Sequence, residues 1–177
     1  MKRVFLLSAV LVALSLLWWA GAIHAGPCEY NIPPRNPNIV YTDHGNGTVT
    51  DTRTGLMWKQ CAEGLSGASC QTGSAQTFTW ANALAHAEAS SFANYSDWRL
   101  PNVKELSSLV EDCRERPAIN THFFPNTVDG GSGFWSGSPH AHADGSGRAW
   151  LLMFSNGGVY NDHRTNSHRV RLVRSSQ

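Results

Sequence analysis

The segment from Ser96 to Cys113, SDWRLPNVKELSSLVEDC, constrains the fold of this chain more than any other part of it. Pro101 cannot lie inside a helix but can precede one, and Asn102 and Glu105 have the spacing of a capping box. The sequence therefore predicts a helix after Asn102 with a polar side and an apolar stripe at helical spacing. The stripe consists of Val103, Leu106, Leu109, Val110 and Cys113, and the polar side of Lys104, Ser107, Ser108, Glu111 and Asp112.

The residues just before this helix are expected to be extended, with Trp98 and Leu100 entering a core and Arg99 held by carboxylates or carbonyls. An arginine beside a core tryptophan usually serves packing and hydrogen bonding, so a structural role is favoured over ligand contact. We interpret the following residues as one structural motif: Asp97, Trp98, Arg99, Leu100, Pro101 and Glu105.

The first 25 residues are expected to be a cleaved secretory signal peptide. Lys2 and Arg3 precede a continuous apolar run over residues 4–19, and Ala20-Gly21-Ala22 matches the small-residue cleavage rule. A retained membrane anchor is the alternative, but the run is shorter than the ~20 residues that span a bilayer comfortably. No second apolar run of that length follows. The chain is therefore expected to be exported, to the periplasm or outside the cell, with no membrane span after cleavage.

The rest of the chain is expected to form an extended, proline-rich arm over residues 26–38 and a single domain over residues 39–177. Without Lys2 and Arg3, 12 basic and 13 acidic side chains remain, a net charge of −1, which gives no indication of nucleic-acid binding. From residue 140 onward, however, the chain contains five arginines and two aspartates, a local charge of +3, together with four histidines. One end of the molecule is thus basic, and more so in acid.

Four cysteines in an exported chain favour two disulfides, for which sequence alone allows three pairings. Cys61 and Cys70 flank a short glycine- and serine-rich loop that a local bridge would close, which leaves Cys28 to join Cys113. A zinc site is the alternative, but no two cysteines have the C-x-x-C spacing.

The remaining pattern predicts an α+β fold. Asn46-Gly47 is a hairpin signal between strand-like residues 39–43 and 48–51, and residues 56–59 read as a third strand. Thr79 is an expected N-cap for an alanine-rich helix. Further strands are expected over residues 149–154, 159–160 and 170–174.

The residues near the basic end are compatible with three kinds of site. His140, His142, Asp144 and His163 could hold zinc on an extended loop, but H-x-H alone is a weak motif and a solvated loop is favoured. A hydrolase could use Ser138, a histidine and Asp144, but no G-x-S-x-G elbow is present. We therefore expect no enzyme activity, catalytic residue, metal or cofactor.

The third kind of site is a binding surface, because arginine pairs with sulfate or carboxylate and aromatic faces stack on sugars. A plain charged solvent face is the equal alternative. Strand alternation would put Val170 and Leu172 on one face and Arg169 and Arg171 on the other, exposed face. The candidate ligand-binding residues are His140, His142, Asp144, Arg148, Trp150, His163, Arg164 and Arg171.

Several spaced motifs resemble the Lcl C-terminal domain family, which is named after the terminal domain of collagen-like adhesins. They are GNGTVTDTRTGLMW, TW-x-x-A, SDWRLPNVKELSSLV, PAIN, FFPNT, FWSGSP, AWLLMFSNGGV and VRLVR. The RLP-x-x-x-E core is also similar to formylglycine-generating and sulfatase-modifying proteins, whose fold is C-type-lectin-like. The resemblance implies two helices packed on a twisted, mostly antiparallel sheet with long irregular loops. It further implies binding of sulfated glycans, as in adhesin members.

We therefore expect an exported, non-catalytic binding module that recognises a glycan, sulfated or otherwise anionic, or another surface molecule through its C-terminal loops. The alternative is an interaction subunit of an envelope or fibre assembly that binds an envelope protein or forms an oligomer and has no small ligand. A hydrolase is a distant third.

Overall fold

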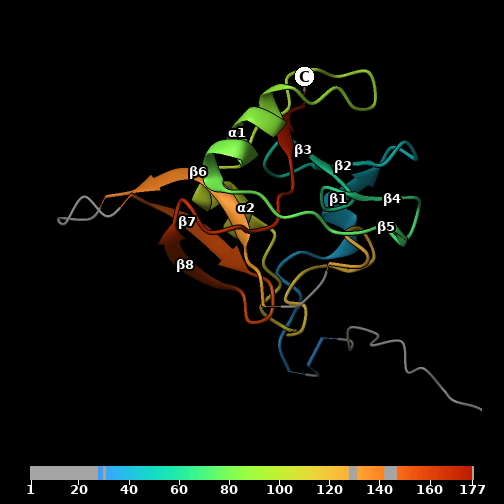
Figure 1. The fold of residues 1–177 in the computed structure, drawn as a ribbon. Helices are drawn as coiled ribbons and strands as arrows, with labels where there is room; N and C mark the ends of the chain where they lie inside the picture. Colours follow the sequence, from blue (N-terminus) through green and yellow to red (C-terminus); the bar gives the residue numbers. More distant parts are fainter. Residues whose placement is uncertain (1–27, 30, 128–130, 142–146, 177) are drawn as a thin grey trace, which may run out of the picture.

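The computed structural model describes residues 28–29, 31–127, 131–141 and 147–176, which form two helices, one 3-10 turn and nine short strands (Figure 1). The expected signal peptide lies outside the described residues. In chain order the elements are η1 (Asn38–Val40), β1 (Tyr41–Asp43), β2 (Thr48–Asp51), β3 (Leu56–Lys59), β4 (Leu65–Ser66), β5 (Thr72–Gly73), α1 (Trp80–Glu88), α2 (Val103–Ser108), β6 (Phe134–His140), β7 (Arg148–Met153), β8 (Gly158–His163) and β9 (Val173–Ser175). No helix among the described residues has the length and apolar character needed to cross a membrane.

The strands form three antiparallel sheets where a single sheet was expected, so the α+β class is confirmed but the sheet arrangement is corrected. The orders are β1-β2-β3-β9, β4-β5 and β6-β7-β8. In Figure 1 the four-stranded and three-stranded sheets lie on opposite sides of the domain, with α2 between them. Trp58 on β3 pairs with Val173 on β9, so the last described strand completes the sheet that the first strands begin.

The first hairpin forms at the expected turn, since Asn46 Oδ1 accepts a hydrogen bond from the backbone N–H of Thr48 at 3.1 Å. Gly47 has a φ of +83°, a conformation that glycine adopts without penalty. The strand before the turn starts later than predicted. Ile39 belongs to η1 and is 88% exposed, and β1 begins only at Tyr41, which is buried.

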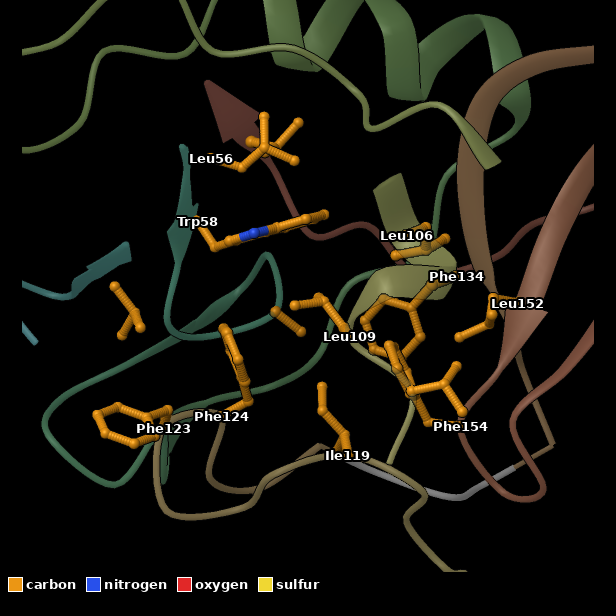
Figure 2. Close-up of a cluster of buried hydrophobic side chains, with 14 of the residues drawn as sticks. Leu56, Trp58, Leu106, Leu109, Ile119, Phe123, Phe124, Phe134, Leu152 and Phe154 are labelled. Carbon is orange, nitrogen blue, oxygen red and sulfur yellow. The ribbon is translucent and has the colours of Figure 1, made fainter. Parts of the chain in front are cut away.

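The core consists of two clusters of buried side chains. The first cluster, drawn in Figure 2, packs Trp58 from the four-stranded sheet against Leu106 and Leu109 and against Phe134 and Leu152 from the three-stranded sheet. The second cluster lies under α1 and contains Trp98, Leu100, Trp135, Val170 and Leu172, together with Ala83 and Ala87 of α1. Because α2 sits at the junction of both large sheets, its apolar side chains hold them together.

The capping box before α2 is confirmed. Asn102 Oδ1 accepts from the Glu105 N–H at 2.9 Å, and Glu105 Oε2 accepts from the Asn102 N–H at 2.8 Å. Arg99 donates to both Glu105 oxygens, at 2.7 and 2.8 Å. Burial alone would raise the pKa of Glu105, but the hydrogen bonds from Arg99 and Asn102 hold it below its usual value.

The rest of the motif is also structural. Trp98 is 3% exposed and its indole N–H donates to the Phe92 carbonyl at 3.1 Å, while Leu100 and Pro101 are buried. Asp97 accepts a 2.6 Å hydrogen bond from Arg174, which holds the pKa of its carboxyl below the usual range.

The helix itself is shorter than predicted. It ends at Ser108, with Leu109 as the C-cap, so Cys113 does not lie on a helical stripe. The chain leaves the helix because the next backbone groups bond elsewhere: Val110 bridges to Ile119, and the Glu111 N–H donates to the Ala118 carbonyl at 3.1 Å. Contacts with Ala118 and Ile119 thus end the helix at Ser108, although no glycine or proline follows it there.

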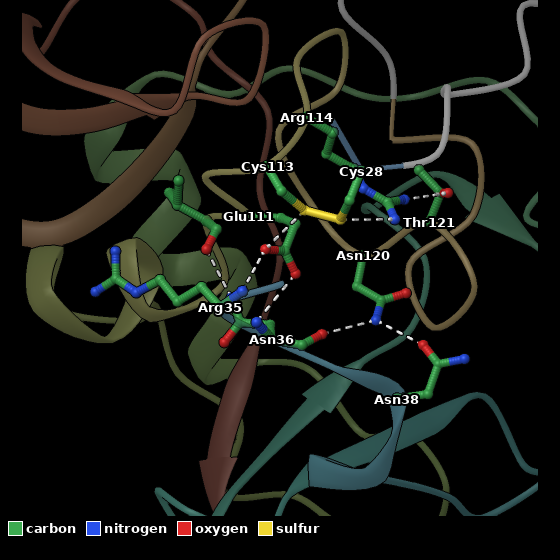
Figure 3. The surroundings of a disulfide bond; sticks show 10 residues. Cys28, Arg35, Asn36, Asn38, Glu111, Cys113, Arg114, Asn120 and Thr121 are labelled. Atoms are coloured by element: carbon green, nitrogen blue, oxygen red, sulfur yellow. Dashed lines mark hydrogen bonds between the residues drawn. A yellow bond between two sulfur atoms is a disulfide. The ribbon is translucent and has the colours of Figure 1, made fainter. Parts of the chain in front are cut away.

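This change of direction turns Glu111 inward, although the helical pattern assigned it to the polar side. Glu111 is fully buried, and its carboxylate accepts hydrogen bonds from the backbone N–H groups of Arg35 at 2.6 Å and Asn36 at 3.0 Å (Figure 3). The N-terminal arm is therefore held by a buried carboxylate.

The two disulfides join Cys28 to Cys113 and Cys61 to Cys70, the pairing that the local loop favours. Their Cα atoms are 4.7 and 5.3 Å apart. As Figure 3 shows, the first bond lies next to Glu111, so a covalent link and a carboxylate fix the arm at the same place.

Candidate functional site

Four of the predicted ligand-binding residues lie on one face of the β6-β7-β8 sheet. His140 pairs with Arg148, and Arg148 pairs with His163 across the next strand, so these side chains share a face. Trp150 lies two residues further along β7 and therefore on the same face. Arg148 contacts Nε2 of His163 at 3.1 Å, and the ring centroids of His140 and Trp150 are 4.4 Å apart. The sheet thus places on one face residues that the sequence had indicated only as lying near the same loop.

Trp150 and Val159 of this face also line a groove against α2. The groove has a volume of about 500 Å³ and is open to solvent. Its α2 side carries Val103, Lys104, Ser107 and Ser108, and Arg35 of the N-terminal arm completes it. We call this site the Trp150 groove.

The arm brings Arg35 to the groove because Asn36 is anchored beside it. Asn36 is fully buried, and its side-chain amide donates to the carbonyls of Ser108 at 3.1 Å and Val110 at 2.6 Å. Arg35 itself is exposed and forms a 3.4 Å ion pair with Asp112, in which both side chains are more than half exposed. Such a surface pair is weak, so the guanidinium remains able to bind a ligand.

The charge of the groove is positive. Arg35 and Lys104 line it, and Arg148 lies beside Trp150 on the same strand. Among the described residues, the Lys104 ammonium has no hydrogen-bond or ion-pair partner, and Asp112 is the one carboxylate paired with a groove cation. An apolar indole flanked by cations and serine hydroxyls is suited to a ligand that has both a flat apolar face and anionic groups.

Arg171 does not belong to this surface, which corrects its prediction as a ligand-binding residue. It is fully buried and donates to the carbonyls of Lys59 at 3.1 Å and Gln60, and to Thr127 Oγ1 at 2.9 Å. Its guanidinium lies over the rings of Phe124 and Phe134. Burial lowers its pKa to about 9, so it stays charged at neutral pH.

The predicted strand over residues 170–174 begins only at Val173, as β9, but the alternation predicted for residues 170–172 is correct, and both sides of this segment are buried. Val170 and Leu172 enter the second cluster, while Arg171 points into the first. The segment runs between the two core clusters, which a pattern of alternating residues cannot reveal.

Arg164 is also separated from the groove. Its guanidinium carbon lies 4.5 Å from the ring centre of Trp80 on α1, and its Nε donates to the Arg148 carbonyl at 3.0 Å. It therefore joins the turn after β8 to α1 and β7.

The proposed zinc ligands are only partly visible, because His142 and Asp144 lie outside the described residues. Within the described part of the chain, the cluster of three potential metal ligands is Cys28, Glu111 and Cys113, whose sulfurs are joined in a disulfide. Ser138, the serine considered for a hydrolase, accepts a 3.0 Å hydrogen bond from the Val103 N–H and so positions α2.

Sequence reasoning missed Arg35, Lys104, Ser107 and Ser108 as groove residues. Lys104 and the two serines were assigned to the polar side of the helix, which is correct, but the sheet that faces them could not be inferred. Arg35 lies more than 60 residues before α2. The predicted Cys28–Cys113 bond ties the arm to this region, but the buried Glu111 carboxylate that holds the Arg35 backbone was placed wrongly on the surface.

These observations define a disulfide-bonded α+β domain with a cationic, tryptophan-lined groove. A family model, the Lcl C-terminal domain, matches residues 47–174, and the chain belongs to that family. The match covers every strand from β2 to β8, both helices and most of β9, but neither Arg35 nor Cys28. A search of curated proteins found no match.

Proposed function

We propose that this protein is a non-catalytic module that binds an anionic glycan, such as a sulfated polysaccharide, in the Trp150 groove. The observation that carries the proposal is the combination of one indole with two lining cations in a groove of about 500 Å³. Ligand sites are typically concave, mostly apolar and furnished with a few polar groups, and this volume lies within their usual range of roughly 300–1,000 Å³.

Each part of the groove has a role in this proposal. The Trp150 ring would stack on the apolar face of a sugar, while Arg35 and Lys104 would pair with sulfate or carboxylate groups on either side. Ser107 and Ser108 donate their hydroxyl protons to the carbonyls of Val103 and Glu105, so their oxygens would accept hydrogen bonds from sugar hydroxyls.

Two finer expectations belong to the same proposal. A C-type-lectin-like arrangement would be consistent with two short helices among antiparallel strands and with the long irregular segments of residues 109–127. Export to the periplasm or cell exterior would suit two disulfides, which persist in oxidising compartments.

The test is binding of the oxidised protein to heparin, measured by isothermal titration calorimetry at several salt concentrations. Affinity should fall steeply with salt, because contacts between exposed charges are screened over about 8 Å at physiological ionic strength. Trp150→Ala should weaken binding roughly tenfold or more, equivalent to about 1.4 kcal/mol. Lys104→Ala should weaken binding and also reduce its salt dependence.

Two matched variants control for this experiment. Tyr160→Ala removes an exposed aromatic side chain from the opposite face of the neighbouring strand, and Arg116→Ala removes an exposed cation that does not line the groove. Both should bind heparin as the wild type does. If the control variants lose as much affinity as the groove variants, binding reflects overall charge and the groove is not the site.

One observation favours the alternative of an assembly subunit. β8 is an edge strand of its sheet and exposes two large apolar side chains, Val159 at 42% and Tyr160 at 47%. Edge strands with such residues can add a strand from another chain. A concentration-dependent mass in light scattering that Val159→Lys abolishes would support this alternative; a monomer at all concentrations would count against self-assembly.

A further inference from the structure

β8 is the open edge of the three-stranded sheet. The other edge strand, β6, is covered, because the Trp135 N–H donates to the Arg169 carbonyl at 2.9 Å and the Gly137 N–H donates to the Pro101 carbonyl at 2.7 Å. Figure 1 shows β8 at the outer margin of this sheet. Within the described part of the chain, no strand pairs with its outer side. An edge left open in this way presents backbone donors and acceptors to another strand.

Two residues of β8 direct free backbone groups outward. The outer side is identified by His163, whose N–H donates to Asp162 Oδ1 at 2.8 Å and whose carbonyl accepts from the Asn166 N–H at 2.9 Å, neither of them on β7. Because the backbone groups of successive strand residues point to alternate sides, those of Val159 and Asn161 also point outward. Among the described residues, these two N–H and two C=O groups have no hydrogen-bond partner.

The side chains at this edge are apolar and unguarded. Val159 and Tyr160 are both exposed and lie on opposite faces of the sheet. Soluble proteins usually guard an open edge with lysine, proline or a β-bulge. β8 contains neither lysine nor proline, and its register with β7 has no shift. An unguarded apolar edge is typical of a surface that another strand covers.

We propose that β8 pairs in antiparallel fashion with β8 of a second copy of this chain, about a two-fold axis that passes beside Tyr160. In this register Val159 lies opposite Asn161 of the second copy. Each such pair exchanges two hydrogen bonds, so all the outward groups are satisfied. Tyr160 lies opposite its own counterpart, with the two Cβ atoms about 4.5–5.5 Å apart. The two three-stranded sheets then form one continuous sheet.

The free edge itself selects this partner and this register. A shift in one direction would place Val159 opposite His163 of the second copy, whose backbone groups are already bonded within its own chain. A shift in the other direction would place Asn161 opposite Gly157, which lies in the β7–β8 turn outside the strand. Two outward residues on either side of Tyr160 are complementary to themselves, as an interface between two identical subunits requires.

The ends of the interface are also complementary. In the proposed register Asp162 lies opposite Gly158 of the second copy, which has no side chain. The Tyr160 ring of that copy lies over its own Gly158, since a Cβ there would be 2.6 Å from the ring. Tyr160 Oη accepts a hydrogen bond from Asn156 Nδ2 at 2.9 Å, so its proton is available to the Asp162 carboxylate across the interface.

The dimer does not rest on the proposed function. The pairing uses the backbone of Val159, and no groove residue from α2 or from the N-terminal arm takes part. Trp150→Ala should therefore dimerise as the wild type does, and the Trp150 groove needs no second copy to bind heparin. Each of the two proposals can fail without the other.

The first test is sedimentation velocity of the oxidised protein at concentrations from about 10 µM to about 1 mM. A contact of this small size should give a weak dimer, with a dissociation constant of roughly 10–1,000 µM. A wild-type protein that is still monomeric at the highest concentration would overturn the proposal, and β8 would then be open to a different protein only.

Two charge variants test the position of the two-fold axis. Tyr160→Lys and Tyr160→Glu each place like charges opposite one another, so each should weaken its own dimer about fivefold or more. An equimolar mixture of the two should dimerise again, because lysine then faces glutamate. Leu84→Lys, the matched control at an exposed position on α1, should dimerise as the wild type does. Unchanged dimers of either Tyr160 variant alone, or a mixture that stays monomeric, would contradict the register.

Amide hydrogen exchange of the wild type gives a test that needs no substitution. The Val159 and Asn161 amides should exchange about twofold or more slowly at the highest protein concentration than at the lowest, because they are bonded only in the dimer. The Tyr160 amide points toward β7 and should show no such dependence. Exchange of Val159 and Asn161 that is independent of concentration would show that β8 does not form the interface.

Discussion

Replacing Arg171 by methionine should destabilise the protein without selectively removing ligand binding. The substitution keeps an unbranched chain among Phe124 and Phe134 but removes every donor that Arg171 offers. The Lys59 and Gln60 carbonyls and the Thr127 hydroxyl would each lose a hydrogen bond inside the core. Unsatisfied buried groups cost about 1–3 kcal/mol each, so the loss from three partners is roughly 3–9 kcal/mol.

Relief of the buried charge opposes this loss. Burial already weakens the protonated guanidinium, as its pKa of about 9 indicates, and removing a buried ion often recovers several kcal/mol. We therefore expect a net destabilisation of about 3 kcal/mol. For a domain of roughly 150 residues this corresponds to a decrease of about 6–12 °C in Tm.

The assay is guanidinium denaturation of the oxidised protein, with Arg148→Met as the matched control. Arg148 lies on the groove face and is only partly buried, so its substitution should change the free energy of unfolding by less than about 1 kcal/mol. If Arg171→Met is as stable as wild type, or loses heparin binding at unchanged stability, then Arg171 is not a structural cation and the reasoning is refuted.

Three further predictions concern stability. Trp98→Ala should lower the free energy of unfolding by about 3–5 kcal/mol because the indole is 3% exposed, and an unchanged thermal melt would contradict its place in the core. Removing the Cys28–Cys113 bond by double serine substitution should cost about 4–5 kcal/mol, against about 2–3 kcal/mol for Cys61–Cys70, since their separations are 85 and 9 residues. Chemical denaturation of the two double serine variants measures these two costs, and equal costs would argue against the loop-entropy explanation. Glu105→Gln keeps an acceptor for the helix cap but loses the ion pair with Arg99. Because the folded pKa of Glu105 is depressed, the wild type should exceed this variant in Tm at neutral pH. The difference should begin to shrink as pH falls through the ordinary glutamate pKa of about 4.3 and should vanish only below the lowered folded pKa. A pH-independent difference would show that the ion pair is not its cause.

The sequence was most informative where local chemistry determines the structure. The capping box of Asn102 and Glu105, the Asn46-Gly47 turn and the Thr79 N-cap all form as expected, because each depends on residues within a few positions of one another. The pairing of Arg99 with a carboxylate is of the same kind.

Long-range contacts decided the features that sequence reasoning missed. Glu111 is polar and follows a helical stripe, yet it is buried because the arm brings two backbone N–H groups to it from 75 and 76 residues away. Arg171 has the spacing of a surface residue, yet both faces of its segment are covered by the core. The local sequence pattern therefore indicates neither the burial of Glu111 nor that of Arg171.

The candidate site likewise combines residues that the sequence predicted with residues that only long-range packing places there. Arg148, Trp150 and His163 were predicted as candidate ligand-binding residues near the histidine-rich loop, and the sheet places them on one face. The opposite wall of the groove comes from α2 and from Arg35, which required knowing how the helix packs on β7 and where Glu111 holds the arm.

The most direct test of the central claim is to locate bound heparin on the molecule. In an NMR titration of the ¹⁵N-labelled, oxidised protein with a heparin oligosaccharide, the Trp150 indole N–H and the backbone amides of Lys104 and Arg35 should shift together and saturate with one affinity. Shifts confined to other surfaces, or no change at the Trp150 indole while heparin is bound, would contradict the account of the groove as the binding site.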